Sequence, residues 1–182
     1  MIMKKTLYSI LMLVGVLVAF TSCEKEEIEN TATVETAGEW HISVAALDAD
    51  GEVLDPDVFG DGVYNILTCN TAANVSDKMF IIDEMCYYFP YQVEVKVDPA
   101  NLTFSTSDSE NLFGPSDYGG ATVSITGGKI VKDGAVTPSG QKADYIEYFV
   151  SFSDDYILAN YLPAGTVYKV SGYRYTGFAA DE

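Results

Sequence analysis

The stretch that decides the fold is Tyr91-Gln92-Val93-Glu94-Val95-Lys96-Val97-Asp98, in which apolar and polar side chains alternate without a break. Successive side chains of a β-strand point to opposite faces of the sheet, so this pattern predicts a strand with one dry face and one wet face. The turn sequence Asp98-Pro99-Ala100-Asn101 ends the strand. We therefore expect an antiparallel sheet with one face in the core.

Seven further segments have the composition of strands, and turn sequences separate them. No window of ten or more residues repeats its apolar residues with the period of a helix. The pair Gly127-Gly128 interrupts one strand and predicts a bend or bulge there, although a tight hairpin also fits the sequence. The eight expected strands are residues 38–45, 63–69, 78–83, 91–98, 102–107, 121–132, 144–153 and 167–176.

Eight antiparallel strands can close into a small barrel or stack as a β-sandwich. A closed barrel has no exposed strand edge, and eight strands leave an interior wide enough for one small ligand. We therefore expect residues 37–182 to form one all-β domain, a small antiparallel eight-stranded barrel, with a β-sandwich as the alternative.

Residues 1–22 have the three zones of a secretory signal peptide: Lys4 and Lys5, an apolar run over residues 7–20, and the small polar pair Thr21-Ser22. A membrane-spanning helix needs about 20 apolar residues, and this run is shorter and leads into a charged segment. The sequence therefore predicts a cleaved signal.

The segment Val18-Ala19-Phe20-Thr21-Ser22-Cys23 resembles the lipobox of bacterial lipoproteins, in which the cysteine is acylated and becomes the new N-terminus. We expect a lipid anchor on Cys23 and a flexible tether over residues 23–36. The following Glu24-Lys25-Glu26-Glu27 resembles the signal that sends lipoproteins of the Bacteroidota to the cell surface, although a solvated tether has the same composition. The resemblance implies an outer-membrane protein that contacts the membrane only through Cys23.

Charge and cysteine content exclude several kinds of partner and bond. With 27 acidic and 10 basic residues the net charge is −17, so nucleic acid and anionic lipid headgroups are unsuitable partners. If a hairpin turns near Asn74, Cys69 faces about Met79 and lies more than ~20 Å from Cys86, beyond the reach of a disulfide. We expect both to be free, buried thiols.

Few residues offer catalytic or metal-binding chemistry. His41 is the single histidine, so a Ser/His/Asp hydrolase would have to use it, and no Gly-x-Ser-x-Gly motif supplies a nucleophile. The alternation of the first strand places His41 opposite Trp40, which predicts an outward-facing strand residue. Acids in the loop from Asp48 to Asp57 could surround Ca²⁺, although a solvated turn explains them equally well. We predict no metal site, no cofactor and no defined catalytic residue.

Several short motifs, in this order, resemble the lipid-binding putative hydrolases, small lipid-anchored domains of the Bacteroidota. The resemblance implies a lipocalin-like barrel with a ligand cavity, and it carries over no catalytic residue. It covers residues 37 to about 106, and the remainder only by strand pattern. The motifs are Ala37-Gly38-Glu39-Trp40, Tyr64-Asn65, Asn70-Thr71-Ala72-Ala73-Asn74, Lys78-Met79-Phe80-Ile81-Ile82-Asp83 and Val93-Glu94-Val95-Lys96-Val97-Asp98.

The sequence thus predicts a surface lipoprotein that binds a small apolar or amphipathic, lipid-like ligand inside a barrel. Tyrosines suit such a pocket because each has an apolar ring and a polar tip. One alternative is a β-sandwich that binds protein or a host or dietary glycan, and a second is a weak hydrolase using His41. The predicted ligand-binding residues are Trp40, Tyr64, Tyr91, Val93, Val95, Phe104, Tyr148 and Tyr173.

Overall fold

The computed structural model describes residues 30–60, 64–83, 90–113, 122–153 and 162–181. The chain divides into two compact units, Met1–Asn30 and Thr31–Glu182, and the strands belong to the second. No helix among the described residues is long and apolar enough to cross a membrane. The elements are β1 (Gly38–Leu47), β2 (Val53–Asp55), β3 (Tyr64–Asn70), β4 (Lys78–Asp83), β5 (Tyr91–Asp98), β6 (Thr103–Glu110), β7 (Thr122–Val136), β8 (Lys142–Phe152), β9 (Val167–Arg174) and the 3-10 turn η2 (Ala179–Asp181).

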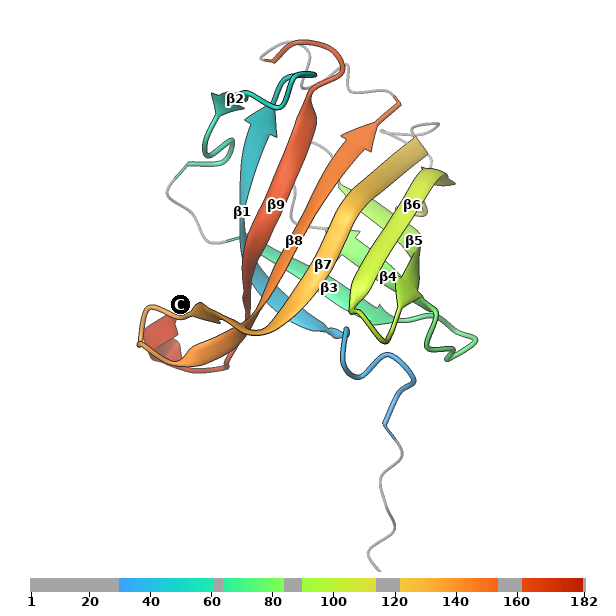
Figure 1. The fold of residues 1–182 in the computed structure, drawn as a ribbon, viewed down its shortest axis with the longest axis vertical. Helices are drawn as coiled ribbons and strands as arrows, with labels where there is room; N and C mark the ends of the chain where they lie inside the picture. Colours follow the sequence, from blue (N-terminus) through green and yellow to red (C-terminus); the bar gives the residue numbers. More distant parts are fainter. Residues whose placement is uncertain (1–29, 61–63, 84–89, 114–121, 154–161, 182) are drawn as a thin grey trace, which may run out of the picture. The chain divides into compact units, whose positions relative to one another are not determined.

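The strands form one closed antiparallel barrel (Figure 1). From β3 to β9 each strand pairs with the next in sequence, and β1 pairs with β3 on one side and with β9 on the other. β1 closes the barrel because its first half, Gly38–Ile42, pairs with β3 while Trp40–Leu47 pairs with β9. Eight strands make the barrel, and the short β2 is added beside β1. The predicted all-β barrel is confirmed, and the β-sandwich alternative is wrong.

The expected strands match the observed ones closely, with β2 as the addition. β4 and β5 have the predicted bounds, and the other ends differ by three residues or fewer except at the end of β7. The Gly127-Gly128 pair lies in a bulge of the continuous β7, where the register to β8 shifts between Thr126 and Lys129. Gly127 has a φ of 61°, a value that favours glycine. The bend is therefore confirmed and the hairpin alternative is excluded.

Alternate side chains of every barrel strand point into the interior. On β5 these are Tyr91, Val93, Val95 and Val97, all buried, as the alternation of the sequence predicted. Isoleucine, valine and aromatic side chains from the other strands complete one continuous apolar core. Burial of these side chains is the main stabilising contribution to the barrel.

The two ends of the barrel are built differently. Residues 31–37 precede β1, and β9 finishes beside them at Arg174; we call this the closed end. Antiparallel pairing places the last residue of β1, Leu47, and the first residue of β5, Tyr91, at the opposite end, which we call the far end.

Cys69 is a free, half-buried thiol on β3, and burial raises its pKa. The β3–β4 register places Phe80 opposite it, so the expected partner Met79 was wrong by one residue. The prediction for Cys86 falls outside the described residues.

Candidate functional site

The interior of the barrel collects six of the eight residues predicted to line a ligand site. Their exposed fractions are 3% or less, and they belong to one contiguous core. They enter from four strands, and each lies on the inward-facing side of its strand. The six are Trp40, Tyr91, Val93, Val95, Phe104 and Tyr148.

Tyr64 lies at the edge of this core, half-buried at the start of β3. Its hydroxyl donates a hydrogen bond of 2.8 Å to the carbonyl oxygen of Phe59, and the two rings are 4.7 Å apart. Tyr64 therefore closes the side of the interior near the segment that follows β2, rather than lining its centre.

Tyr173 corrects the prediction, because it lies on the outer face of β9 and not in the interior. It pairs with His41, whose neighbours Trp40 and Ile42 point inward. Its hydroxyl donates a 3.0 Å hydrogen bond to the carbonyl oxygen of Asp181 in η2. The C-terminal segment thus covers Tyr173 from outside.

A pair of tyrosine hydroxyls spans the interior. Tyr91 on β5 and Tyr148 on β8 share a buried hydrogen bond of 2.7 Å. Edge-on ring contacts join Tyr91 to Phe152 at 5.5 Å and Tyr148 to Phe104 at 5.8 Å. Phe152 continues to Tyr168 at 6.2 Å. Because β5 and β8 are three strands apart in the sheet order, this contact reaches across the barrel and places two polar atoms inside an apolar wall.

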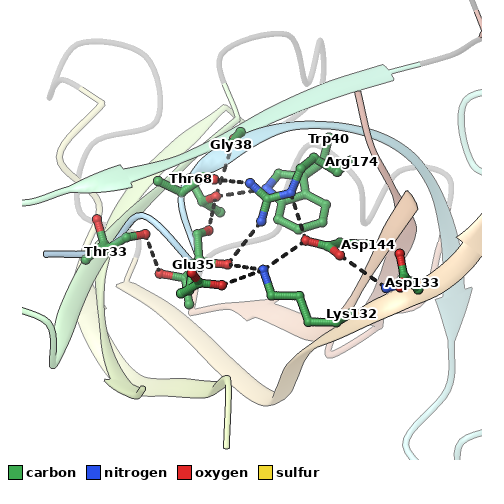
Figure 2. Close-up of polar contacts among 11 residues, drawn as sticks. Thr33, Glu35, Gly38, Trp40, Thr68, Lys132, Asp133, Asp144 and Arg174 are labelled. Atoms are coloured by element: carbon green, nitrogen blue, oxygen red, sulfur yellow. Dashed lines mark hydrogen bonds and ion pairs between the residues drawn. The ribbon is translucent and has the colours of Figure 1, made fainter. Parts of the chain in front are cut away.

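The closed end is organised around Trp40 and Arg174 (Figure 2). The Arg174 guanidinium lies over the Trp40 ring, 4.5 Å from its centroid, a cation–π contact. The indole Nε1 of Trp40 donates a 2.8 Å hydrogen bond to Thr68 Oγ1, which in turn donates one of 2.6 Å to the carbonyl oxygen of Thr36. The interior therefore ends at a layer of satisfied polar groups.

Arg174 and Lys132 fasten the segment before β1 to the barrel (Figure 2). Arg174 donates to the carbonyl oxygens of Glu35 and Ala37 and to the Asp144 carboxylate, the last at 3.2 Å. Lys132 Nζ lies 2.8 Å from the Glu35 carboxylate and 3.1 Å from that of Asp144. This part of the expected tether thus has fixed contacts with the barrel.

The charges of this network shift the pKa values of both carboxyl groups. Burial raises the pKa of Asp144, but hydrogen bonds from Lys132 and the Asp133 amide, with the charge of Arg174, outweigh burial and hold it below its ordinary value. The hydrogen bond and charge of Lys132 lower the pKa of Glu35. At neutral pH both groups are therefore charged, and they hold the closed end together.

The contacts of the His41 side chain with the described residues are aromatic packing and one hydrogen bond of 3.4 Å between its Nδ1 and the Tyr173 hydroxyl. His41 faces outward, as predicted, but it is only 5% exposed. Its ring stacks on Tyr175 at 4.6 Å and lies 5.5 Å from the Tyr173 ring. No serine or carboxylate among the described residues is hydrogen-bonded to it. The described contacts thus give the His41 hydrolase no nucleophile.

The acidic loop from Asp48 to Asp57 is a turn that leads into β2. Asp48 Oδ1 accepts hydrogen bonds of 2.9 Å and 2.8 Å from the backbone amides of Asp50 and Glu52. In the described part of the chain no group of three or more His, Cys, Asp or Glu side chains could hold a metal ion. The turn accounts for the position of Asp48 without a cation.

Sequence reasoning missed Phe152, Tyr168, Thr68 and Arg174 as interior residues. The first two could have been found, because they share a face with Val150 and Val170 by simple alternation. Arg174 shares the face of Val170 by the same alternation, but an inward-facing charge was not expected, and the Trp40 ring of the paired strand β1 makes it acceptable.

Comparison with protein families gives a match over most of the chain. The family described as lipid-binding putative hydrolase matches residues 25–179, which is most of the chain, so the resemblance predicted from the sequence is confirmed. No curated protein matches.

Proposed function

We propose, from the premise that this chain belongs to the lipid-binding putative hydrolase family, that it is a surface lipoprotein holding one amphipathic, lipid-like molecule inside its barrel. The family and the closed barrel support lipid binding in general. The identity of the ligand class, the position of its polar group and the anchoring are proposals.

The observation that carries the proposal is the buried hydroxyl pair of Tyr91 and Tyr148 within the mainly apolar core. Valine and isoleucine side chains around it suit an acyl chain, which gains about 0.8 kcal/mol for each buried methylene group. The two hydroxyls suit a carboxyl, ester or hydroxyl head, because each can donate and accept a hydrogen bond. An amphipathic molecule matches both parts of this interior.

The ligand enters from the far end in this proposal. At the closed end, Trp40, Thr68 and Arg174 already satisfy one another and the segment before β1, so entry there would break charge-assisted hydrogen bonds. At the far end the tyrosine pair lies nearer than Trp40, so the polar head of the ligand would stay close to the entrance.

Trp40 provides the direct test, because it is the single tryptophan of the chain and lies in the core. Titration of the protein with a fatty acid brominated along its chain should quench Trp40 fluorescence saturably, with one equivalent bound by native mass spectrometry. Tyr148→Phe should weaken binding about three- to tenfold, the effect of one lost hydrogen bond of ~1 kcal/mol.

Tyr145→Phe is the matched control, since Tyr145 lies on the same strand but its hydroxyl bonds Glu147 on the outer face at 2.7 Å. This variant should bind as the parent protein does. A fatty acid that neither quenches Trp40 nor adds mass would contradict the proposal. Equal weakening by both variants would remove the assigned role of the hydroxyl pair.

The anchoring is tested separately at Cys23. In cells fed labelled palmitate, Cys23→Ser should abolish labelling and release the protein from the membrane fraction. Proteinase added to intact cells should digest the parent protein if it is on the surface, and a protected protein would place it on an inner face instead.

A further inference from the structure

An open groove of about 510 Å³ lies on the outer side of the barrel, where β5, β6 and β7 meet. Its lining includes two core residues, Val97 and Phe104, and Phe104 is also one of the interior site residues. Lys96 and Asp98 reach it because Val95 and Val97 point inward, and Thr103 and Ser105 reach it because they flank the inward-facing Phe104.

The β7 bulge shapes the floor of this groove. Gly127 and Gly128 line it without side chains, and of the two Gly127 is exposed while Gly128 is buried. A Cβ atom on Gly127 would lie 3.1 Å from the Phe149 ring, and one on Gly128 would overlap the Phe104 ring. The packing of aromatic rings against both faces of β7 therefore requires glycine at these two positions.

Two lysines flank the groove, and the charge of one is not balanced. The Lys96 ammonium has no ion pair or hydrogen bond with any residue that the structure describes. It also lies directly opposite Lys78 on β4, and like charges at such positions destabilise a sheet. Lys78 has its own partner, Glu94, at 2.8 Å. Lys96 thus lies at the edge of the groove in a position where its charge is unfavourable for the stability of the sheet.

The acidic side chains near the groove have hydrogen-bond or ion-pair partners other than Lys96. Asp98 accepts hydrogen bonds from the Ala100 and Asn101 amides and the Asn101 side chain, which lower its pKa. Lys129 lies 2.9 Å from Glu147, but Glu147 is shared with Lys169, also at 2.9 Å. Asp98 also lines the groove, and among the lysines of this wall Lys96 is the one that has no ion pair with a described carboxylate, although the net charge of the chain is −17.

We propose that this groove binds a small, hydroxyl-rich molecule bearing one oxyanion, a carboxylate or a phosphate, between the ammonium groups of Lys96 and Lys129. β6 lies between the two lysine-bearing strands, so Thr103 and Ser105 present their hydroxyls where the rest of the ligand would lie. An ammonium group has three donors, and Lys129 retains donors beyond its contact with Glu147. The polar groups of this site lie on the outer face of the barrel, and it shares Phe104 with the interior site.

The test uses the whole mature chain, labelled with ¹⁵N, titrated with inorganic phosphate, with glucuronate and with uncharged glucose. Phosphate or glucuronate should shift the amide signals of Lys96, Gly127, Gly128 and Lys129 saturably, and added salt should weaken the effect. Glucose should not. The charged probe that binds more tightly identifies the oxyanion, so either one supports the proposal.

Lys96→Gln should raise the dissociation constant at least fivefold, while Lys142→Gln, which alters an exposed lysine on β8, should leave it unchanged. The melting temperature of Lys96→Gln should equal or exceed that of the parent, because repulsion from Lys78 is relieved. Trp40 quenching by the brominated fatty acid should not change. Absence of saturable shifts with both charged probes, or equal weakening by both lysine variants, would overturn the proposal.

Discussion

The two ends of the barrel satisfy their polar groups by different means. At the closed end, Arg174 and Lys132 donate to carboxylates and backbone carbonyls, and the guanidinium covers Trp40. Toward the far end, the polar contacts among the described residues include a bond between the uncharged hydroxyls of Tyr91 and Tyr148.

This difference separates stability from binding. Charge-assisted hydrogen bonds are about twice as strong as neutral ones, and a buried partner left unsatisfied is costly. A neutral hydroxyl can exchange its partner for a ligand with little loss, because the number of hydrogen bonds stays the same. We therefore expect substitutions at the closed end mainly to lower the free energy of unfolding. Substitutions at the tyrosine pair should mainly change the affinity for the ligand.

The largest effect is expected from Trp40→Ala. The fully buried ring packs in the core, bonds Thr68 and supports Arg174, so its loss should lower the free energy of unfolding by about 3–5 kcal/mol. Urea unfolding followed by circular dichroism measures this change. Val53→Ala, at a side chain 59% exposed on β2, is the control and should change it by less than ~0.5 kcal/mol.

Arg174→Met should lower the free energy of unfolding by about 1–3 kcal/mol, measured in the same way. Methionine keeps apolar contact with Trp40 but donates no hydrogen bond to Glu35, Ala37 or Asp144. Lys142→Met removes an exposed positive charge and should have little effect. Equal stability of the Arg174→Met and Lys142→Met variants would contradict the view that the hydrogen bonds of Arg174 stabilise the closed end.

Much of the barrel could be predicted from sequence because its strands alternate cleanly. β4 and β5 have the predicted bounds, and their inward-facing residues follow from the period of two. β2 was missed because Val53–Asp55 is three residues long, lies in an acidic loop and exists through its pairing with Ala46 and Leu47. A strand this short shows no alternation, and its existence depends on a partner strand rather than on its own residues.

The site could be predicted only in part, for a similar reason. Tyr91 and Tyr148 were found by alternation, but their hydrogen bond joins strands that sequence alone does not place across from each other. Tyr173 was assigned to the wrong face, because in β9 tyrosines occur on both faces and an inward-facing arginine is unexpected. The Trp40 ring makes that arginine acceptable, and this contact depends on the closure of the barrel.

Acid should weaken the closed end without affecting the tyrosine pair. The pKa of Asp144 is held below its ordinary value of 3.8, so its contribution is complete above that pH and is lost as the pH falls through the lower folded-state pKa. Asp144→Asn should cost about 1–2 kcal/mol at pH 7, and this difference from the parent should shrink below about pH 3.8. Urea unfolding of both proteins at several pH values tests this, and a cost that stayed constant would argue against a charged Asp144.

Tyr148→Phe should have the smallest effect on stability, about 1 kcal/mol, because one hydroxyl is removed and Tyr91 loses that partner. This cost should not change between pH 7 and pH 3, since a tyrosine hydroxyl keeps its proton throughout the acid range. Circular dichroism during urea unfolding, run beside the Asp144→Asn series, measures both quantities under the same conditions.

Bound ligand makes this last comparison sharper. If a lipid-like molecule takes over the hydroxyl contact, saturating fatty acid should stabilise the parent protein more than it stabilises the Tyr148→Phe variant. The reason is that only the parent has both hydroxyls to bond the ligand. The control is Tyr145→Phe, whose lost bond to Glu147 lies on the outer face and should leave the stabilisation by fatty acid intact. If Tyr148→Phe did not reduce the stabilisation by fatty acid, the hydroxyl pair would stabilise the barrel and would not bind the ligand. The contacts at both ends of the barrel would then contribute to stability alone.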